Sequence, residues 1–143
     1  MALSTPLGRL LRIRELQEEQ GRLALEAAMN EVNGVRAALA KAAECDKQGR
    51  QIVTDSARTG RLADRIAGLE ETRAADRKTH ILQGKLETAE QQAAHVRERF
   101  LSTRAQRRQA ETLVEARDAR AESEAERRRQ RDMDDWHRAR DKA

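Results

Sequence analysis

The stretch 52-IVTDSARTG-60 decides the fold of this chain, because it holds the best cluster of turn-forming residues in the sequence. Two β-branched residues are followed by small polar side chains and then by a glycine, a composition typical of a chain reversal. We predict a turn over about residues 54–60. A weaker alternative for the turn is the stretch 45-CDKQG-49.

The composition on both sides of this turn favours long helices. The chain has 143 residues, of which 38% are charged and 1% aromatic, and Ala, Glu, Arg, Leu, Gln and Lys dominate. So few large side chains do not build a compact core, because folding must offset about 1–2 kcal/mol of backbone entropy per residue. Strong helix formers in turn argue against disorder. The sequence therefore predicts an all-α protein of the coiled-coil type.

The first helix is predicted over about residues 6–53. Thr5 can cap it, and Pro6 stands at the first helical position, where a missing N–H costs nothing. Apolar residues then recur in steps of three and four, the pattern of a helix packed along another helix. These residues are Leu25, Met29, Val32, Val35, Leu39 and Ala42.

The second helix is predicted over about residues 61–140, with no proline to interrupt it. Between Arg73 and Lys78 its apolar register lapses and resumes out of phase, which predicts a stutter. Its apolar stripe comprises Leu62, Ile66, Leu69, Leu82, Leu86, Ala89, Ala93, Val96, Phe100, Ala110 and Val114.

The simplest architecture is a long antiparallel two-helix coiled-coil hairpin, formed by residues 1–143 as a single domain. Folding the chain near residue 57 places Phe100 beside residues 14–16. The first helix then ends opposite about Ala110, so the second helix continues as a C-terminal helical overhang. Within the overhang we predict the ion pairs Glu124–Arg128 and Asp134–Arg138, each worth only about 0.2–0.5 kcal/mol. Such a helix is marginal in water, and we expect a partner to complete it.

The sequence offers little chemistry for catalysis. It has no glycine-rich loop that could cradle a phosphate. His80, His95 and His137 are too widely spaced for a metal site, and Cys45 has no histidine close by in the sequence. We therefore expect no catalytic residue, no metal, no cofactor and no small-molecule ligand.

No run of residues approaches the ~20 apolar residues of a membrane span. The first residues also lack the apolar core of a signal peptide. We expect a cytoplasmic protein without direct membrane insertion.

Nucleic acid is a minor alternative as a partner, suggested by the basic stretches 127-RRRQR-131 and 97-RERFLSTRAQRR-108. The first of these is neutralised by its surroundings, because residues 122–143 hold seven basic and seven acidic side chains. The second has five arginines against Glu98. Charge runs of this kind are most often solvated helix faces.

The overhang carries one small apolar patch. Met133 and Trp136 are three residues apart and therefore neighbours on a helix, and Ala139 roughly continues the face. One interpretation is that Trp136 folds over its own helix and covers arginine side chains in a cation–π contact. The other is that it anchors a partner protein, since tryptophan and arginine are enriched in interface hot spots. We favour the anchor.

Three stretches of the chain resemble the flagellar type III export stalk proteins, the FliJ type. The opening 7-LGRLLRIRELQEEQ-20 leads into an Ala- and Glu-rich helix, as it does in that family. The stretch 97-RERFLSTRAQRRQAETL-113 is similar to the family's basic, aromatic-containing stretch. The ending 129-RQRDMDDWHRARDK-142 is similar to the family's closing basic helix, with Met133, Asp134, Asp135 and Trp136 as its most distinctive part.

The resemblance implies a hairpin whose terminal ends insert into a hexameric export ATPase and promote its activity. It also implies an export-gate membrane protein and export chaperones as partners. The residues that would contact the ATPase ring are Arg9, Arg12, Arg14, Arg127, Arg128, Arg131, Met133 and Trp136. The family's gate-binding pattern falls on Ile66 and Leu69, with Arg65 in place of its aromatic residue.

Three alternatives remain open at this point. The closest is the stalk protein of a virulence type III secretion system. The others are a basic helical nucleic-acid-binding protein and a coiled-coil scaffold that dimerises through its apolar stripe.

Overall fold

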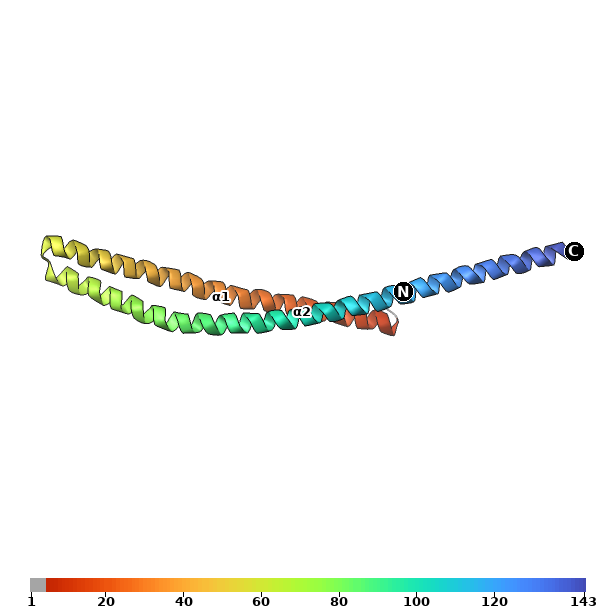
Figure 1. The fold of residues 1–143 in the computed structure, drawn as a ribbon, viewed down its shortest axis with the longest axis horizontal. Helices are drawn as coiled ribbons and strands as arrows, with labels where there is room; N and C mark the ends of the chain where they lie inside the picture. The colour runs from red at the N-terminus through yellow and green to blue at the C-terminus, as the bar shows by residue number, and fades with distance from the viewer. Residues whose placement is uncertain (1–4) are drawn as a thin grey trace. The chain divides into compact units, whose positions relative to one another are not determined.

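A computed structural model describes residues 5–143 of the chain, which form two α-helices and no strand. Helix α1 spans Pro6–Thr59, and helix α2 spans Leu62–Asp141 (Figure 1). The two helices pack against each other in antiparallel directions. The predicted all-α class and the two-helix hairpin are confirmed.

The beginning of α1 is the one predicted from the sequence. The Thr5 hydroxyl accepts a hydrogen bond from the Gly8 N–H at 3.1 Å, and Pro6 follows as the first helical residue. This side-chain cap satisfies one of the backbone N–H groups that the first turn of a helix leaves without a partner.

The turn is shorter than predicted and lies later in the chain. Helix α1 continues through residues 54–59, and only Gly60 and Arg61 separate it from α2. Gly60 has a φ of 71° and donates its N–H to the Ser56 carbonyl at 2.9 Å. This is a left-handed helix cap, a conformation that glycine adopts without steric cost.

The polar residues that suggested a longer turn are accommodated within the helix. Thr54 donates its hydroxyl to the Arg50 carbonyl at 3.0 Å, and Ser56 donates to the Val53 carbonyl at 2.7 Å. A threonine or serine that returns its hydroxyl to the preceding turn needs no other partner, so it does not have to end the helix. The predicted boundary at residue 53 is therefore wrong by six residues.

The chain divides into two compact units, each built from both helices. One unit is Gly21–Phe100, and the other combines Met1–Gln20 with Leu101–Ala143.

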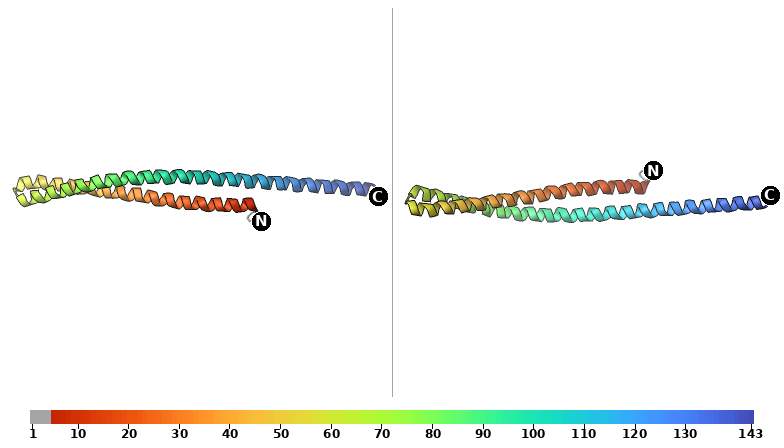
Figure 2. Two further views of the ribbon diagram at one scale, coloured as in Figure 1. Left: turned by 90° about the horizontal axis from the view of Figure 1, so that it is seen from below. Right: turned by 90° about the horizontal axis from the view of Figure 1, so that it is seen from above.

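In the unit Gly21–Phe100, α1 and α2 lie side by side from the turn onward (Figures 1 and 2). One set of buried and half-buried positions alternates steps of three and four along both helices, as knobs-into-holes packing requires. We call these positions the seam. In α1 they are Gly21, Leu25, Ala28, Val32, Val35, Leu39, Ala42, Asp46, Gly49, Val53 and Ser56. In α2 they are Gly68, Thr72, Ala75, Thr79, Leu82, Leu86, Ala89, Ala93, Val96 and Phe100.

The centre of this seam is a small apolar cluster. Val32, Ala89 and Ala93 are buried together, with Ala28 and Leu86 packed against them. Val32 is only 2% exposed, whereas Met29, predicted for the seam, is 42% exposed. Ala28 occupies the seam position, and the longer side chain of Met29 lies on the outer surface.

The predicted stutter between Arg73 and Lys78 does not occur. The seam passes through Thr72, Ala75 and Thr79 in unbroken register. The apolar pattern is interrupted in the sequence because this part of the seam consists of small residues instead of large apolar ones.

Close to the turn, glycines bring the two backbones together. A Cβ atom added at Gly68 would lie 2.8 Å from the Gly49 carbonyl oxygen and 2.9 Å from Cγ2 of Val53. This close approach puts Gly68 in the seam instead of Leu69. Farther along, Phe100 lies against Gly21 rather than beside residues 14–16, because the turn is centred later than residue 57.

In the other unit, α1 pairs with α2 only as far as Arg117. Arg117 donates a hydrogen bond to the Thr5 hydroxyl near the start of α1. Ala110 and Val114, both part of the apolar stripe predicted for α2, are buried, although Val114 lies beyond the predicted end of the pairing at Ala110. From residue 118 to residue 143 every residue is exposed, and Figure 2 shows this part of α2 running on alone. The predicted C-terminal helical overhang is thus present, and it begins at residue 118.

Candidate interaction surfaces

The overhang, residues 118–143, carries the apolar patch predicted from the sequence. Met133 and Trp136 are each 59% exposed, and no other large apolar residue occurs in the overhang. Because this helix is unpaired, a partner can contact the exposed tryptophan without first separating α1 from α2. This patch is the strongest candidate for a partner contact in the unit that contains it.

Trp136 also makes contacts within its own helix. The Arg140 guanidinium lies 5.5 Å from the centre of the indole ring, and the His137 ring meets it edge-on at 5.2 Å. The cation–π contact anticipated from the sequence is therefore formed. It covers only part of the indole, which leaves the rest open to a partner.

The arginines predicted beside this patch lie on the same open helix. Arg127, Arg128 and Arg131 are all exposed. The predicted pairs Glu124–Arg128 and Asp134–Arg138 are not formed in the described chain; instead Arg129 pairs with Glu126 at 3.3 Å. The three predicted arginines thus keep their charge on the surface.

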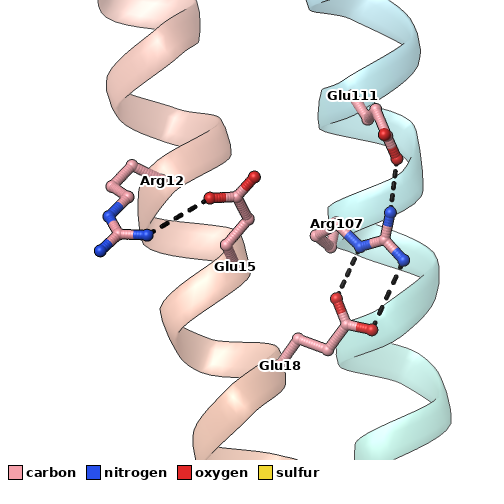
Figure 3. A network of polar contacts seen from close by, with 5 residues as sticks. All are labelled: Arg12, Glu15, Glu18, Arg107 and Glu111. Atoms are coloured by element: carbon pink, nitrogen blue, oxygen red, sulfur yellow. Dashed lines mark hydrogen bonds and ion pairs between the residues drawn. The ribbon is translucent and has the colours of Figure 1, made fainter. Parts of the chain in front are cut away.

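The N-terminal arginines have three different environments. Arg9 is exposed, and Arg12 forms an ion pair with Glu15 at 3.6 Å on the surface of α1 (Figure 3). Arg14 donates hydrogen bonds to Gln17 at 3.1 Å and to Gln106 of α2 at 2.9 Å. Arg14 therefore helps to hold the two helices together.

A charged network joins the helices next to these arginines. Figure 3 shows Arg107 of α2 between Glu18 of α1, at 2.6 Å, and Glu111 of its own helix. The hydrogen bond to Glu18, together with the charges of both carboxylates, raises the pKa of Arg107 above its ordinary value. Arg107 is half-buried, whereas the other four arginines of the basic stretch 97–108 are exposed.

The structure does not bring the two predicted groups of ATPase-contacting arginines together. Arg14 lies beside Gln106, and α1 begins opposite Arg117. At a rise of 1.5 Å per residue, Arg127 is about 15 Å farther along α2 than Arg117. The N-terminal and C-terminal arginines therefore lie at successive positions along the axis of α2 and do not form a single cluster.

The predicted gate residues lie on the outer surface of the hairpin near its turn. Leu62, Ile66 and Leu69 are 69%, 53% and 37% exposed. Steps of four and three place them on one face of α2. Their assignment to the seam was wrong, and the error makes Ile66 and Leu69 more accessible to a partner than the sequence suggested.

One feature was missed by the sequence reasoning, a groove in the unit Gly21–Phe100 of about 540 Å³. It is lined by Ala38, Lys41, Ala42, Cys45, Glu71, Ala74, Ala75, Lys78, Ile81, Leu82 and Lys85. The sequence signal for it is the loss of large side chains between Arg73 and Lys78, the same stretch for which the apolar pattern predicts a stutter.

Within residues 5–143 no group of three or more His, Cys, Asp or Glu side chains is arranged to hold a metal ion. None of the helices described has a stretch apolar enough and long enough to cross a membrane. Comparisons with family models, with curated proteins and with solved structures give no match for this chain.

Proposed function

We propose that this chain is the non-catalytic stalk of a type III protein export ATPase, with the flagellar apparatus as its place of action. Its α2 overhang would insert into the hexameric ATPase ring and raise ATP turnover. The observation that carries the proposal is the overhang itself, a helix without an intramolecular partner that exposes Met133 and Trp136 among charges of both signs.

A thin charged rod suits such a position. A single stalk in a sixfold ring meets each subunit differently, so a surface of many weak ionic contacts fits better than one large apolar patch. Residues 122–143 hold equal numbers of basic and acidic side chains, and all of them are exposed. Contacts of this kind depend on salt concentration.

The outer face of α2 near the turn is the proposed contact for the export-gate membrane protein, through Ile66 and Leu69. With these contacts, the protein would lie in the cytoplasm and be associated with the inner membrane only through the export apparatus. Export chaperones complete the proposed set of partners.

The test is ATP hydrolysis by a purified export ATPase with this protein added at less than one copy per ring subunit. We expect turnover to rise. The double variant Met133→Ala/Trp136→Ala should raise the concentration for half-maximal stimulation about 30-fold, the effect of losing an interface hot spot. Leu113→Ala, an exposed leucine in the paired part of α2, is the matched control and should stimulate normally.

No stimulation and no change in ATPase oligomerisation by the wild-type protein would refute the proposal. Stimulation of a virulence-system ATPase but not of a flagellar one would move the protein to the virulence system. The gate contact is tested separately, because Ile66→Ala/Leu69→Ala should weaken gate binding and leave ATPase stimulation unchanged.

A further inference from the structure

The groove in the unit Gly21–Phe100, which we call the alanine groove, has a distinct chemistry. Its floor consists largely of alanine side chains from both helices, namely Ala38, Ala42, Ala74 and Ala75. Where two helices meet through alanines, their side chains leave a shallow channel that larger residues would fill. The channel is therefore a direct result of the small residues in this part of the seam.

The rim of the alanine groove is mostly basic. Lys41 of α1 and Lys78 and Lys85 of α2 line it, against the single carboxylate of Glu71. None of these three lysines forms an ion pair within the described part of the chain. Ile81, also at the groove, is exposed.

These features select the kind of occupant. An apolar channel between two antiparallel helices accepts the apolar stripe of a third helix, which completes a three-helix bundle locally. Lysines on both sides of such a channel favour carboxylates at the edges of that stripe. A basic or neutral helix would leave the lysine charges uncompensated.

We propose that the alanine groove binds one amphipathic helix of a partner protein, whose apolar stripe is flanked by aspartate or glutamate residues. This binding is independent of the ATPase contact proposed above, because the groove belongs to the unit Gly21–Phe100 and the overhang does not.

Cys45 provides a direct readout. It is the only cysteine of the chain, it is half-buried, and it lines the alanine groove. A helix seated in the groove would cover the thiol and slow its reaction with an alkylating reagent.

The experiment uses the full-length protein and a synthetic helical peptide with a leucine and alanine stripe flanked by glutamates. A second peptide carries lysines in place of the glutamates, and a third has the first composition in scrambled order. We expect the acidic peptide to bind and to slow Cys45 alkylation at least several-fold, and neither control peptide to do so.

Variants of the protein locate the site. The triple variant Lys41→Glu/Lys78→Glu/Lys85→Glu should lose about ten-fold in affinity for the acidic peptide and gain affinity for the basic one. Ala74→Trp should block the groove. Lys47→Glu is the control, since Lys47 is exposed and close to Cys45 in sequence but does not line the groove.

Two results would overturn the proposal. One is an acidic peptide that leaves Cys45 alkylation unchanged or binds the triple variant as tightly as the wild-type protein. The other is protection of Cys45 that rises with protein concentration in the absence of peptide, which would make a second copy of the chain the occupant. Far-UV circular dichroism of each variant checks that the helices are intact.

Discussion

Gly49 and Gly68 bring the backbones of α1 and α2 into direct contact near the turn. A Cβ atom added at Gly68 would lie 2.8 Å from the Gly49 carbonyl oxygen, and one added at Gly49 would lie 3.0 Å from the Gly68 carbonyl oxygen. Both distances are shorter than ordinary contacts, and the Thr72 hydroxyl oxygen would lie closer still to a Cβ atom at Gly49, at 2.7 Å. The pair therefore fixes how closely the helices approach where the hairpin begins.

Gly68→Ala should destabilise the hairpin. Overpacking costs about 1–3 kcal/mol, and the better helix propensity of alanine returns about 0.5–1 kcal/mol. We expect a net loss of about 1–2 kcal/mol in the free energy of unfolding, measured by urea denaturation followed by circular dichroism. A variant as stable as the wild-type protein would show that the helices do not meet at this pair.

Gly34→Ala and Gly84→Ala form the matched comparison, because they make the same chemical change in open space. Nothing lies within 4 Å of a Cβ atom added at either position. Each substitution should stabilise the protein by about 0.5–1 kcal/mol through helix propensity alone. The same urea titrations measure this gain, and a loss at either position would contradict the helix-interior placement of that glycine.

The local signals in the sequence predicted the fold well. The cap at Thr5 and Pro6 depends on residues within one turn of helix, and the hairpin follows from an apolar stripe on each side of the turn. The overhang followed from counting residues on either side of the turn. Its start at residue 118, rather than just after Ala110, differs because the turn is centred at Gly60 and Arg61.

The main error concerns packing between the helices, which no local signal reports. A search for large apolar residues assigned Leu62, Ile66 and Leu69 to the seam, but the close approach at Gly68 turns them outward. Threonine and serine residues near the turn were assigned to a loop, although their hydroxyls return to the carbonyls of the same helix. The first assignment requires knowledge of what the opposite helix presents, whereas the second depends on hydrogen bonds within a single helix.

The position of the seam is tested by Val32 and Met29, which are neighbours on α1 but differ in burial. Val32→Ala removes buried methyl groups from the central cluster and should cost about 1–3 kcal/mol. Met29→Ala changes an exposed side chain and should alter the free energy of unfolding by less than about 0.5 kcal/mol. Thermal or urea unfolding of both variants measures the difference, and equal effects would place Met29 in the seam.

Asp46 occupies a seam position at a cost to stability. Its Oδ2 accepts a hydrogen bond from Arg50 at 2.9 Å, while its buried Oδ1 has no hydrogen-bond partner among the described residues. An unsatisfied buried oxygen costs about 1–3 kcal/mol, and the exposed pair with Arg50 returns about 0.5 kcal/mol. Asp46→Leu should therefore stabilise the hairpin by about 1 kcal/mol in urea denaturation.

Asp46→Asn serves as the control for this prediction. It keeps the shape of the side chain and leaves an oxygen in the same place, so its stability should stay close to that of the wild-type protein. A leucine variant less stable than the wild-type protein would show that the carboxylate supports the seam.

The overhang should be the least protected part of α2 in the free protein. Residues 118–143 are all exposed, so their helix lacks the tertiary packing that supplies most helical stability. Amide hydrogen exchange should be fast over residues 122–141 and slow around Val32 and Ala89. Deleting residues 122–143 should change the free energy of unfolding of the paired helices by less than about 0.5 kcal/mol.

Trp136→Ala separates the two roles of the indole. If Trp136 serves mainly to anchor a partner, its loss leaves exchange in the free overhang nearly unchanged, because the contact with Arg140 is exposed and weak. The variant should then fail to gain the protection that the wild-type overhang gains when the export ATPase is added. Slow exchange in the free wild-type overhang that Trp136→Ala abolishes would contradict this, because the indole would then be holding its own helix together.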